Sequence, residues 1–188
     1  MEENMVYVYL ATGFEEIEAL TAVDILRRAG IDVQTVSVEE GLTVKGAHGI
    51  GVNADITFDQ ADHDECEMIV LPGGLPGATN LEAHEGLMKK VEEFAASGKN
   101  VAAICASPGV VLAPHGILEG KRATVYPGME GELTKGGAAP QPDGAVTDGN
   151  IITGKGPGFA PQFALAIVAK LAGDEAADKV AKGFLVER

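Results

Sequence analysis

Residues 101–108 read Val-Ala-Ala-Ile-Cys-Ala-Ser-Pro and place a cysteine directly after a short apolar segment. Residues 101–104 are apolar at every position, which is typical of a strand that is covered on both faces of a sheet. Ser107 and Pro108 predict a helix start, because serine caps helix N-termini and proline is tolerated in the first turn. The stretch therefore predicts a strand, a turn that carries Cys105, and a helix.

The same alternation of strands and helices extends outward from this stretch in both directions. We expect strands at 6–10, 31–38, 68–71, 101–104, 123–126 and 145–153, and a twisted hairpin at 42–54. We expect helices at about 15–29, 81–96 and 160–171. The glycine- and proline-rich segment 127–144 is assigned no regular structure. Alternating elements predict an α/β fold with a mostly parallel sheet between helices, and a length of 188 residues predicts a single domain over 1–188.

The amino-acid composition argues against several classes of partner. No apolar run approaches the roughly 20 residues that a membrane span needs. A net charge of -14 disfavours nucleic acids and anionic lipid, although acidity is also a general solubility trait. Residues 1–4 carry two glutamates where a secretory signal carries lysine or arginine, so we expect a cytoplasmic protein. Two cysteines without metal-ligand spacing predict reduced thiols and no metal.

Cys105 is the sharpest functional signal. In parallel sheets, reactive groups gather at the carboxyl ends of the strands, which here are followed by segments 11–18, 72–79 and 105–108. A thiol that meets a helix N-terminus and free backbone N–H groups is favoured as a thiolate. The alternative is a small apolar side chain packed at a strand end. Cys66 lacks this context and is expected to have a packing or surface role.

Glu18 is the second signal. The helical positions Ala22, Ile25 and Ala29 continue backward to Glu18, which places its carboxyl on a side that is otherwise small and apolar. Burial there would raise its pKa and suit it to proton exchange with a substrate or a sulfur. The alternative is an ordinary glutamate in the first turn of a helix.

Glycines follow two of the predicted strands. Gly73 and Gly74 allow a tight turn with accessible N–H groups, as an oxyanion-binding loop needs, although turn formation alone also explains the pair. Residues 154–158 carry three glycines that lack the spacing of a dinucleotide fingerprint, so nucleotide binding is rejected.

Taken together, several motifs are familiar. They are Ala102-Ala103-Ile104-Cys105-Ala106-Ser107-Pro108, Leu71-Pro72-Gly73-Gly74, Gly13-Phe14-Glu15-Glu16-Ile17-Glu18 and Gly156-Pro157-Gly158. With them the chain resembles, over nearly its whole length, the ThiJ/PfpI superfamily in the branch of the human parkinsonism-associated deglycase and its bacterial relatives. The resemblance implies a flavodoxin-like three-layer α/β/α sandwich, like that of class I glutamine amidotransferases, and usually a homodimer. It also implies that the cysteine lies in a strained nucleophile elbow and that the glutamate at position 18 hydrogen-bonds its sulfur.

Two positions depart from the family pattern. The proteolytic branch has a histidine directly after its cysteine, and here that residue is Ala106, so a peptidase lacks its base. Many deglycase-branch members have a histidine before a proline where this chain has Tyr126, a possible auxiliary residue. A phenol can donate a hydrogen bond but is a poor base, since its pKa is about 10. The four histidines, none on a family motif, are expected to be exposed or to cap helices: His48, His63, His84 and His115.

Two functions from different classes follow. In the first, the protein is a cofactor-free glyoxalase or deglycase in which Cys105 adds to an α-oxoaldehyde such as methylglyoxal, free or condensed on an amine or thiol. Glu18 moves the proton, and N–H groups of the Gly73-Gly74 turn and of Ala106 hold the oxyanion. In the second, the protein is an oxidative-stress sensor or chaperone in which Cys105 is oxidised to a sulfinate. A role in thiamine-precursor synthesis finds no phosphate-binding motif to support it.

Overall fold

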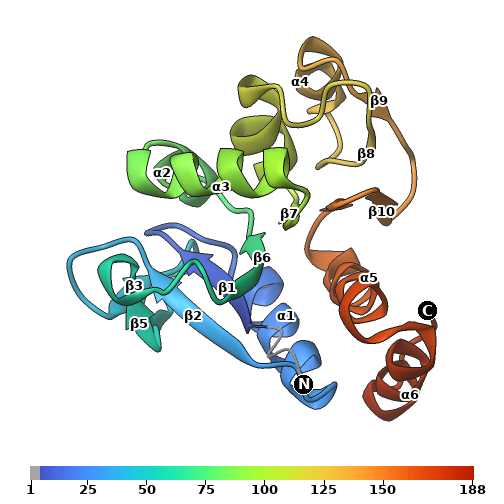
Figure 1. Ribbon diagram of the computed structural model, residues 1–188, viewed down its shortest axis with the longest axis horizontal. Coiled ribbons are helices and arrows are strands. Elements are labelled where there is room, and N and C mark those ends of the chain that lie inside the picture. Colours follow the sequence, from blue (N-terminus) through green and yellow to red (C-terminus); the bar gives the residue numbers. More distant parts are fainter. Residues whose placement is uncertain (1–4) are drawn as a thin grey trace.

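Seven strands form the central sheet of the computed structural model, which describes residues 5–188. They are β1 (Met5–Leu10), β2 (Val33–Ser37), β5 (Ile56–Thr57), β6 (Cys66–Leu71), β7 (Asn100–Ile104), β10 (Ala145–Asp148) and β11 (Ile151–Gly154). Their order is β10-β11-β7-β6-β1-β2-β5, and all pairs are parallel except β10 with β11 (Figure 1). The predicted mostly parallel sheet is confirmed. Residues 1–4, on which the expected lack of a secretory signal rests, lie outside the described residues.

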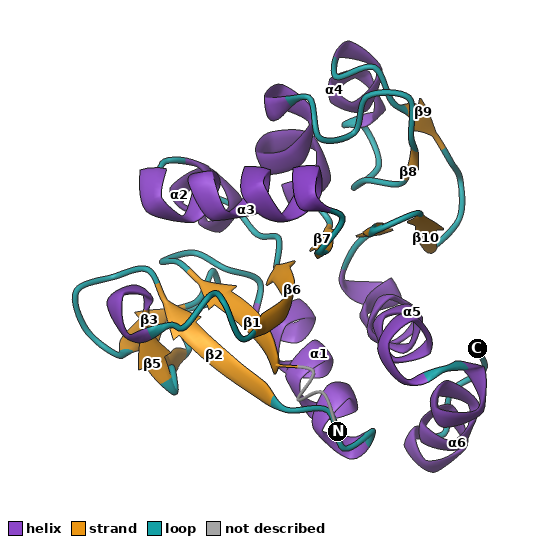
Figure 2. Cartoon of the chain, viewed as in Figure 1, coloured by secondary structure: helices purple, strands orange, loops and turns teal. Residues whose placement is uncertain are grey.

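Helices cover both faces of this sheet (Figure 2). The first layer contains α1 (Glu16–Arg28), α5 (Ala160–Ala172) and α6 (Asp174–Phe184), and the second contains α2 (Gly77–Glu82), α3 (Glu85–Ser97) and α4 (Glu130–Lys135). Successive side chains of a strand point to opposite faces. Val6 and Val8 of β1 therefore pack in the core of the first layer, and Tyr7 and Tyr9 in the core of the second. The flavodoxin-like three-layer sandwich is confirmed.

The strand that precedes Cys105 is central to this core. Residues 101–104 of β7 are fully buried, since β6 and β11 pair with its two edges and helices cover its faces. This explains why the sequence there is apolar at every position rather than alternating. Truncating a side chain such as Ile104 to alanine would cost about 2–5 kcal/mol of stability. The turn that carries Cys105 is thus anchored to the most buried part of the fold.

Shorter elements flank the sheet. β3 (Thr43–Lys45) and β4 (Gly51–Asn53) form the predicted hairpin, and β8 (Arg122–Ala123) pairs with β9 (Ala139–Pro140) in a separate two-stranded sheet. A single π-helical turn covers Pro108–Leu112, and 3₁₀ turns cover Phe58–Gln60, Ala113–His115 and Pro157–Phe159. None of the helices in residues 5–188 is both long and apolar enough to cross a membrane.

The helix expected at 81–96 is two helices. α2 ends before Ala83, and α3 begins after His84, whose backbone is extended and whose Nδ1 accepts a hydrogen bond from the N–H of Leu87 at 3.0 Å. A side chain that caps the first turn of the second helix takes the place of a continuous helical ladder. His84 was expected to be exposed or to cap a helix, and it caps α3.

Three other expectations near the C-terminal half need correction. Segment 127–144 is not irregular throughout, because it contains α4 and β9. The strand expected at 123–126 is reduced to β8 and lies outside the central sheet. Residues 145–153 are two antiparallel strands joined by a turn at Gly149, where φ is 63°. Helix α6 was not expected, although Ala177, Val180, Ala181 and Phe184 recur at the i, i+3, i+4, i+7 spacing of an amphipathic helix.

Candidate active site

Cys105 lies at the point where β7 ends, beside the loop that follows β6 and the first turn of α1. These three segments come together because β1, β6 and β7 are neighbours in a parallel sheet, whose carboxyl ends lie at one edge. A methyl group built on Gly73 would lie 2.5 Å from Cβ of Cys105 and 2.7 Å from Oε2 of Glu18. The two residues that the sequence singled out are therefore brought together across Gly73.

The backbone of Cys105 adopts the left-handed conformation, with φ of 66°. Among the described non-glycine residues only Leu185 shares a positive φ. Such a conformation costs about 1–3 kcal/mol and persists only where its surroundings hold it. Here the N–H of Cys105 donates to the carbonyl of Gly154 at 2.8 Å, and its carbonyl accepts from the N–H of Tyr126 at 2.9 Å. This is the geometry of a nucleophile elbow.

The segment after Cys105 differs from the expected capped α-helix. It is a single π-helical turn, and the hydroxyl of Ser107 does not cap it. That hydroxyl donates instead to the carbonyl of Pro72 at 2.5 Å, in a fully buried position. Ser107 therefore ties the turn after β7 to the loop after β6, a role that no local sequence signal could have revealed.

Glu18 is buried, with 1% of its surface exposed. Its Oε2 accepts a hydrogen bond from the N–H of Gly73 at 2.8 Å. Burial is the main reason that the pKa of Glu18 is raised to about 7, and the nearby carboxylate of Glu15 acts in the same direction. Contacts with the Cys105 thiol and the Gly73 N–H partly offset the rise in this pKa. The carboxyl can thus gain or lose a proton near neutral pH, as proton transfer to a substrate requires.

The expected thiolate character of Cys105 stays a prediction, because the surroundings of the sulfur act on its pKa in opposite directions. Burial, and after it the charge of Glu18, raises the pKa of Cys105 to about 12, whereas N–H groups of Gly74 and Ala106 act in the opposite direction. The residue is still 9% exposed, in contrast to Cys66, which is 1% exposed.

The side chains of Glu18 and Cys105 are neighbours. Each affects the pKa of the other, yet Oε1 of Glu18 has no hydrogen bond of ordinary geometry within residues 5–188. This leaves Oε1 able to accept the thiol proton when a substrate arrives.

The N–H groups of Gly73 and Gly74 have different partners. The N–H of Gly73 is already used by Glu18, so it is not free for the oxyanion role expected of it. Gly74 adopts φ of 87°, and its N–H interacts with the Cys105 thiol, as does that of Ala106. Those two N–H groups remain as donors to an oxyanion formed next to the sulfur.

Tyr126 and Cys66 are the other two residues that the sequence singled out. Tyr126 is 48% exposed and approaches Cys105 through its backbone, with its ring beside Gly156. Cys66 is buried, and its thiol donates to the carbonyl of Met68 at 3.2 Å, which agrees with a packing role.

One cluster near the site was not predicted. Ligand atoms of Glu15, Glu16 and His48 lie within 4.8 Å of one another, and carboxylates and imidazoles are common metal ligands. Glu16 is already engaged, because its two oxygens accept from the N–H and contact Nδ1 of His48, both at 2.8 Å. The cluster joins the hairpin loop to α1, and the expectation of no metal stays a prediction.

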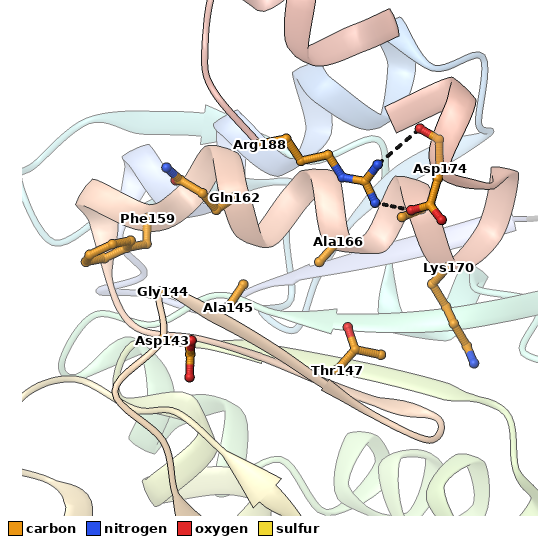
Figure 3. Close-up of a pocket in the computed structure, with 11 residues that line it drawn as sticks. Asp143, Gly144, Ala145, Thr147, Phe159, Gln162, Ala166, Lys170, Asp174 and Arg188 are labelled. Atoms are coloured by element: carbon orange, nitrogen blue, oxygen red, sulfur yellow. Dashed lines mark hydrogen bonds and ion pairs between the residues drawn. The ribbon is translucent and has the colours of Figure 1, made fainter. Parts of the chain in front are cut away.

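A separate groove of about 580 Å³ lies between β10 and α5 (Figure 3). Alanines of both elements form its floor, and Phe159 lies at one end. At the other end Arg188 pairs with Asp174. Neither Cys105 nor Glu18 lines this groove.

The chain is similar to known proteins over almost all of its length. It is 40% identical over 179 residues to "Protein dj-1beta" of Drosophila melanogaster, covering 95% of each chain. It is 39% identical over 181 residues to "Protein DJ-1 homolog B" of Arabidopsis thaliana, and here the match covers 96% of this chain but only 41% of that relative. The solved structure "Toxoplasma gondii DJ-1, oxidized" superposes with a TM-score of 0.93 at 35% identity, covering 98% of this chain and 100% of the other.

The model of the DJ-1/PfpI family matches residues 4–170, a range that includes Glu18, the Gly73-Gly74 turn, Cys105 and Tyr126. With relatives of this identity and coverage, the family resemblance read from the motifs is confirmed. The chain belongs to the DJ-1/PfpI family.

Proposed function

We propose that the protein is a cofactor-free, cysteine-dependent glyoxalase or deglycase that acts on α-oxoaldehydes such as methylglyoxal, or on their adducts with amines and thiols. One observation carries the proposal. Cys105, whose backbone is in the left-handed conformation, and the buried Glu18 both lie against Gly73. A nucleophile beside an acid whose pKa is about 7 suits nucleophilic attack followed by proton transfer.

The first step uses both side chains. Glu18, as carboxylate, takes the proton of the Cys105 thiol while the sulfur forms a bond to the aldehyde carbon. The carbonyl π bond breaks, and its oxygen becomes an oxyanion that the N–H groups of Gly74 and Ala106 can hold. Because the thiol pKa is raised, Glu18 acts here as a general base rather than as a partner of a standing thiolate.

The later steps return the enzyme to its starting state. The carboxyl protonates the oxyanion, and Glu18 then takes the hydrogen from the former aldehyde carbon as a proton. It delivers that proton to the neighbouring carbon, while the proton of the new hydroxyl moves to the former ketone oxygen, which leaves a 2-hydroxyacyl group on the Cys105 sulfur. Water cleaves this thioester, releasing a 2-hydroxy acid and the free thiol. One aldehyde and one water thus give one hydroxy acid, and no redox cofactor is consumed.

The test is production of lactate from methylglyoxal without glutathione. We expect Cys105→Ser to abolish it and Glu18→Gln to reduce it at least about 100-fold, the usual contribution of a general base. Cys66→Ser serves as the matched control and should retain activity, since that thiol is buried among packing residues. Unchanged turnover in Cys105→Ser would refute the proposal.

A second function is favoured by one similar solved structure, "Toxoplasma gondii DJ-1, oxidized". We propose that Cys105 of this chain can also be oxidised to a sulfinate, as in an oxidative-stress sensor or chaperone. Two molecules of peroxide each transfer one oxygen to the sulfur and leave as water. Intact-mass and peptide spectra after mild peroxide should show two added oxygens on the Cys105 peptide. Preferential oxidation of Cys66 would contradict this role.

The chain is further proposed to act as a homodimer in the cytoplasm, where thiols stay reduced. Support for a dimer is the exposure of three large apolar side chains, Ile17 and Leu20 on α1 and Ile50 in the hairpin loop that contacts α1. Light scattering after gel filtration should give the mass of two chains, and Ile17→Glu should shift it to one. Leu42→Glu, at another exposed leucine, should not change the mass.

A further inference from the structure

Two exposed large side chains belong to residues whose backbones lie next to Cys105. Leu75 is 59% exposed and Tyr126 is 48% exposed, although burying such side chains is normally favourable. Neither is a member of the two buried cores that hold the layers together. Their exposure therefore has no packing explanation within the described chain.

Both residues are connected to the site through their backbones. Leu75 directly follows Gly74, whose N–H interacts with the sulfur of Cys105. Tyr126 donates its N–H to the carbonyl of Cys105 at 2.9 Å. The Tyr126 ring also lies against Gly156, where an added Cβ would come within 3.4 Å of the ring. Two loops from different parts of the sheet thus bring the backbones of Leu75 and Tyr126 close to Cys105.

We propose that Leu75 and Tyr126 form an apolar rim that determines substrate preference. The rim favours α-oxoaldehydes with an apolar or aromatic substituent over methylglyoxal, whose substituent is a single methyl group. An aldehyde bound to Cys105 would place that substituent against the rim and remove apolar surface from water. This inference rests on the proposed function for its catalytic part, but not for the apolar rim itself.

The first test compares kcat/KM for phenylglyoxal and methylglyoxal. Contact with a half-exposed rim should be worth the low end of hydrophobic discrimination, so we expect a ratio of about 10 in favour of phenylglyoxal. Leu75→Ser and Tyr126→Ser should each lower the ratio about threefold, and the double variant should bring it close to one. Tyr126→Phe keeps the ring and loses only the hydroxyl, so it should keep the ratio. Leu42→Ser, which changes an exposed leucine between β2 and β3, is the matched control.

The second test needs no turnover. The Cys105 thiol adds to a maleimide by forming a bond from sulfur to one alkene carbon while the neighbouring carbon gains a proton. We would measure this rate by peptide mass for N-phenylmaleimide and N-ethylmaleimide and divide their ratio by that of a free thiol in solution. The wild type should favour the phenyl reagent, and the two serine variants should lose that preference while the Leu42→Ser control keeps it.

The outcomes separate the two proposals. A normalised maleimide ratio near one that no rim variant changes would overturn the apolar rim, even if methylglyoxal is turned over. A clear phenyl preference in alkylation without any Cys105-dependent turnover would support the rim and overturn the proposed enzyme function. A ratio that falls equally in Leu42→Ser would also refute the rim, because the effect would then not be local.

Discussion

Gly73 lies against both Glu18 and Cys105: its N–H donates to the Glu18 carboxyl at 2.8 Å, and a methyl group built on its Cα would lie 2.5 Å from Cβ of Cys105. A glycine is needed at this position for space rather than for an unusual φ, since Gly73 is not among the residues with positive φ. Any side chain there would push the acid and the thiol apart.

Gly73→Ala tests this relationship. The added methyl would lie 2.5 Å from Cβ of Cys105 and 2.8 Å from the carbonyl oxygen of Ile104, so the two loops must separate. We expect a loss of about 1–3 kcal/mol in the free energy of unfolding and loss of thiol-dependent turnover. Gly131→Ala is the control, because no atom lies within 4 Å of its added methyl and alanine favours its helix α4. Equal stability of the two variants in urea titrations would contradict the close contact.

Burial of Glu18 should make stability depend on pH. Its pKa is about 7 in the folded protein against 4.5 in the unfolded chain, so the folded state holds the proton more tightly. Below pH 4.5 both states are protonated and the carboxyl imposes no ionisation penalty. Between pH 4.5 and 7 the unfolded chain loses its proton first, so stability falls as pH rises, by about 3 kcal/mol in total.

Glu18→Gln removes this titration while its amide oxygen can still accept from Gly73. The variant should therefore gain about 3 kcal/mol of stability relative to wild type between pH 4 and pH 8, measured by urea unfolding. The exposed Glu40→Gln is the control for a lost charge. A variant that parallels the wild type at every pH would show that Glu18 keeps an ordinary pKa.

The same carboxylate should slow alkylation of Cys105. Its charge raises the thiol pKa, so at pH 7.5 Glu18→Gln should lower that pKa and speed the reaction with iodoacetamide severalfold. Cys66 should react only after unfolding, because its pKa is also raised by burial and it is 1% exposed. Slower alkylation of Cys105 in Glu18→Gln would indicate that the carboxyl protects a thiolate instead.

Ser107→Ala should weaken the packing of the two segments that meet beside Cys105. It removes the buried hydrogen bond to the carbonyl of Pro72 and leaves that buried acceptor without the hydroxyl, at a cost of about 1–3 kcal/mol. We also expect lower turnover, since the bond holds the loop after β6 against the turn after β7. Ser97→Ala, at an exposed serine, should change stability by less than about 0.5 kcal/mol. Thermal unfolding of both variants measures the difference.

Local signals located the main chemical groups. The apolar segment 101–104 followed by a cysteine predicted both a buried strand and the turn after it. A run of consecutive apolar residues is enough to indicate a strand that is buried on both faces. The helical spacing that pointed Glu18 inward works for the same reason, and the residue is buried. In contrast, the helix break at His84 and the structure within 127–144 depend on capping and on distant pairing, and they were missed.

The sequence by itself determined the strands and helices that lead to the site, the family, and the positions of Cys105, Glu18 and the glycine pair, since each of these depends on residues close together in the chain. Only the tertiary structure decided how those groups behave. Burial raises the pKa of both the acid and the thiol, and Gly73 gives its N–H to the acid instead of to a substrate. Desolvation and long-range hydrogen bonds arise from segments that meet only after folding, so they cannot be predicted from a local sequence pattern.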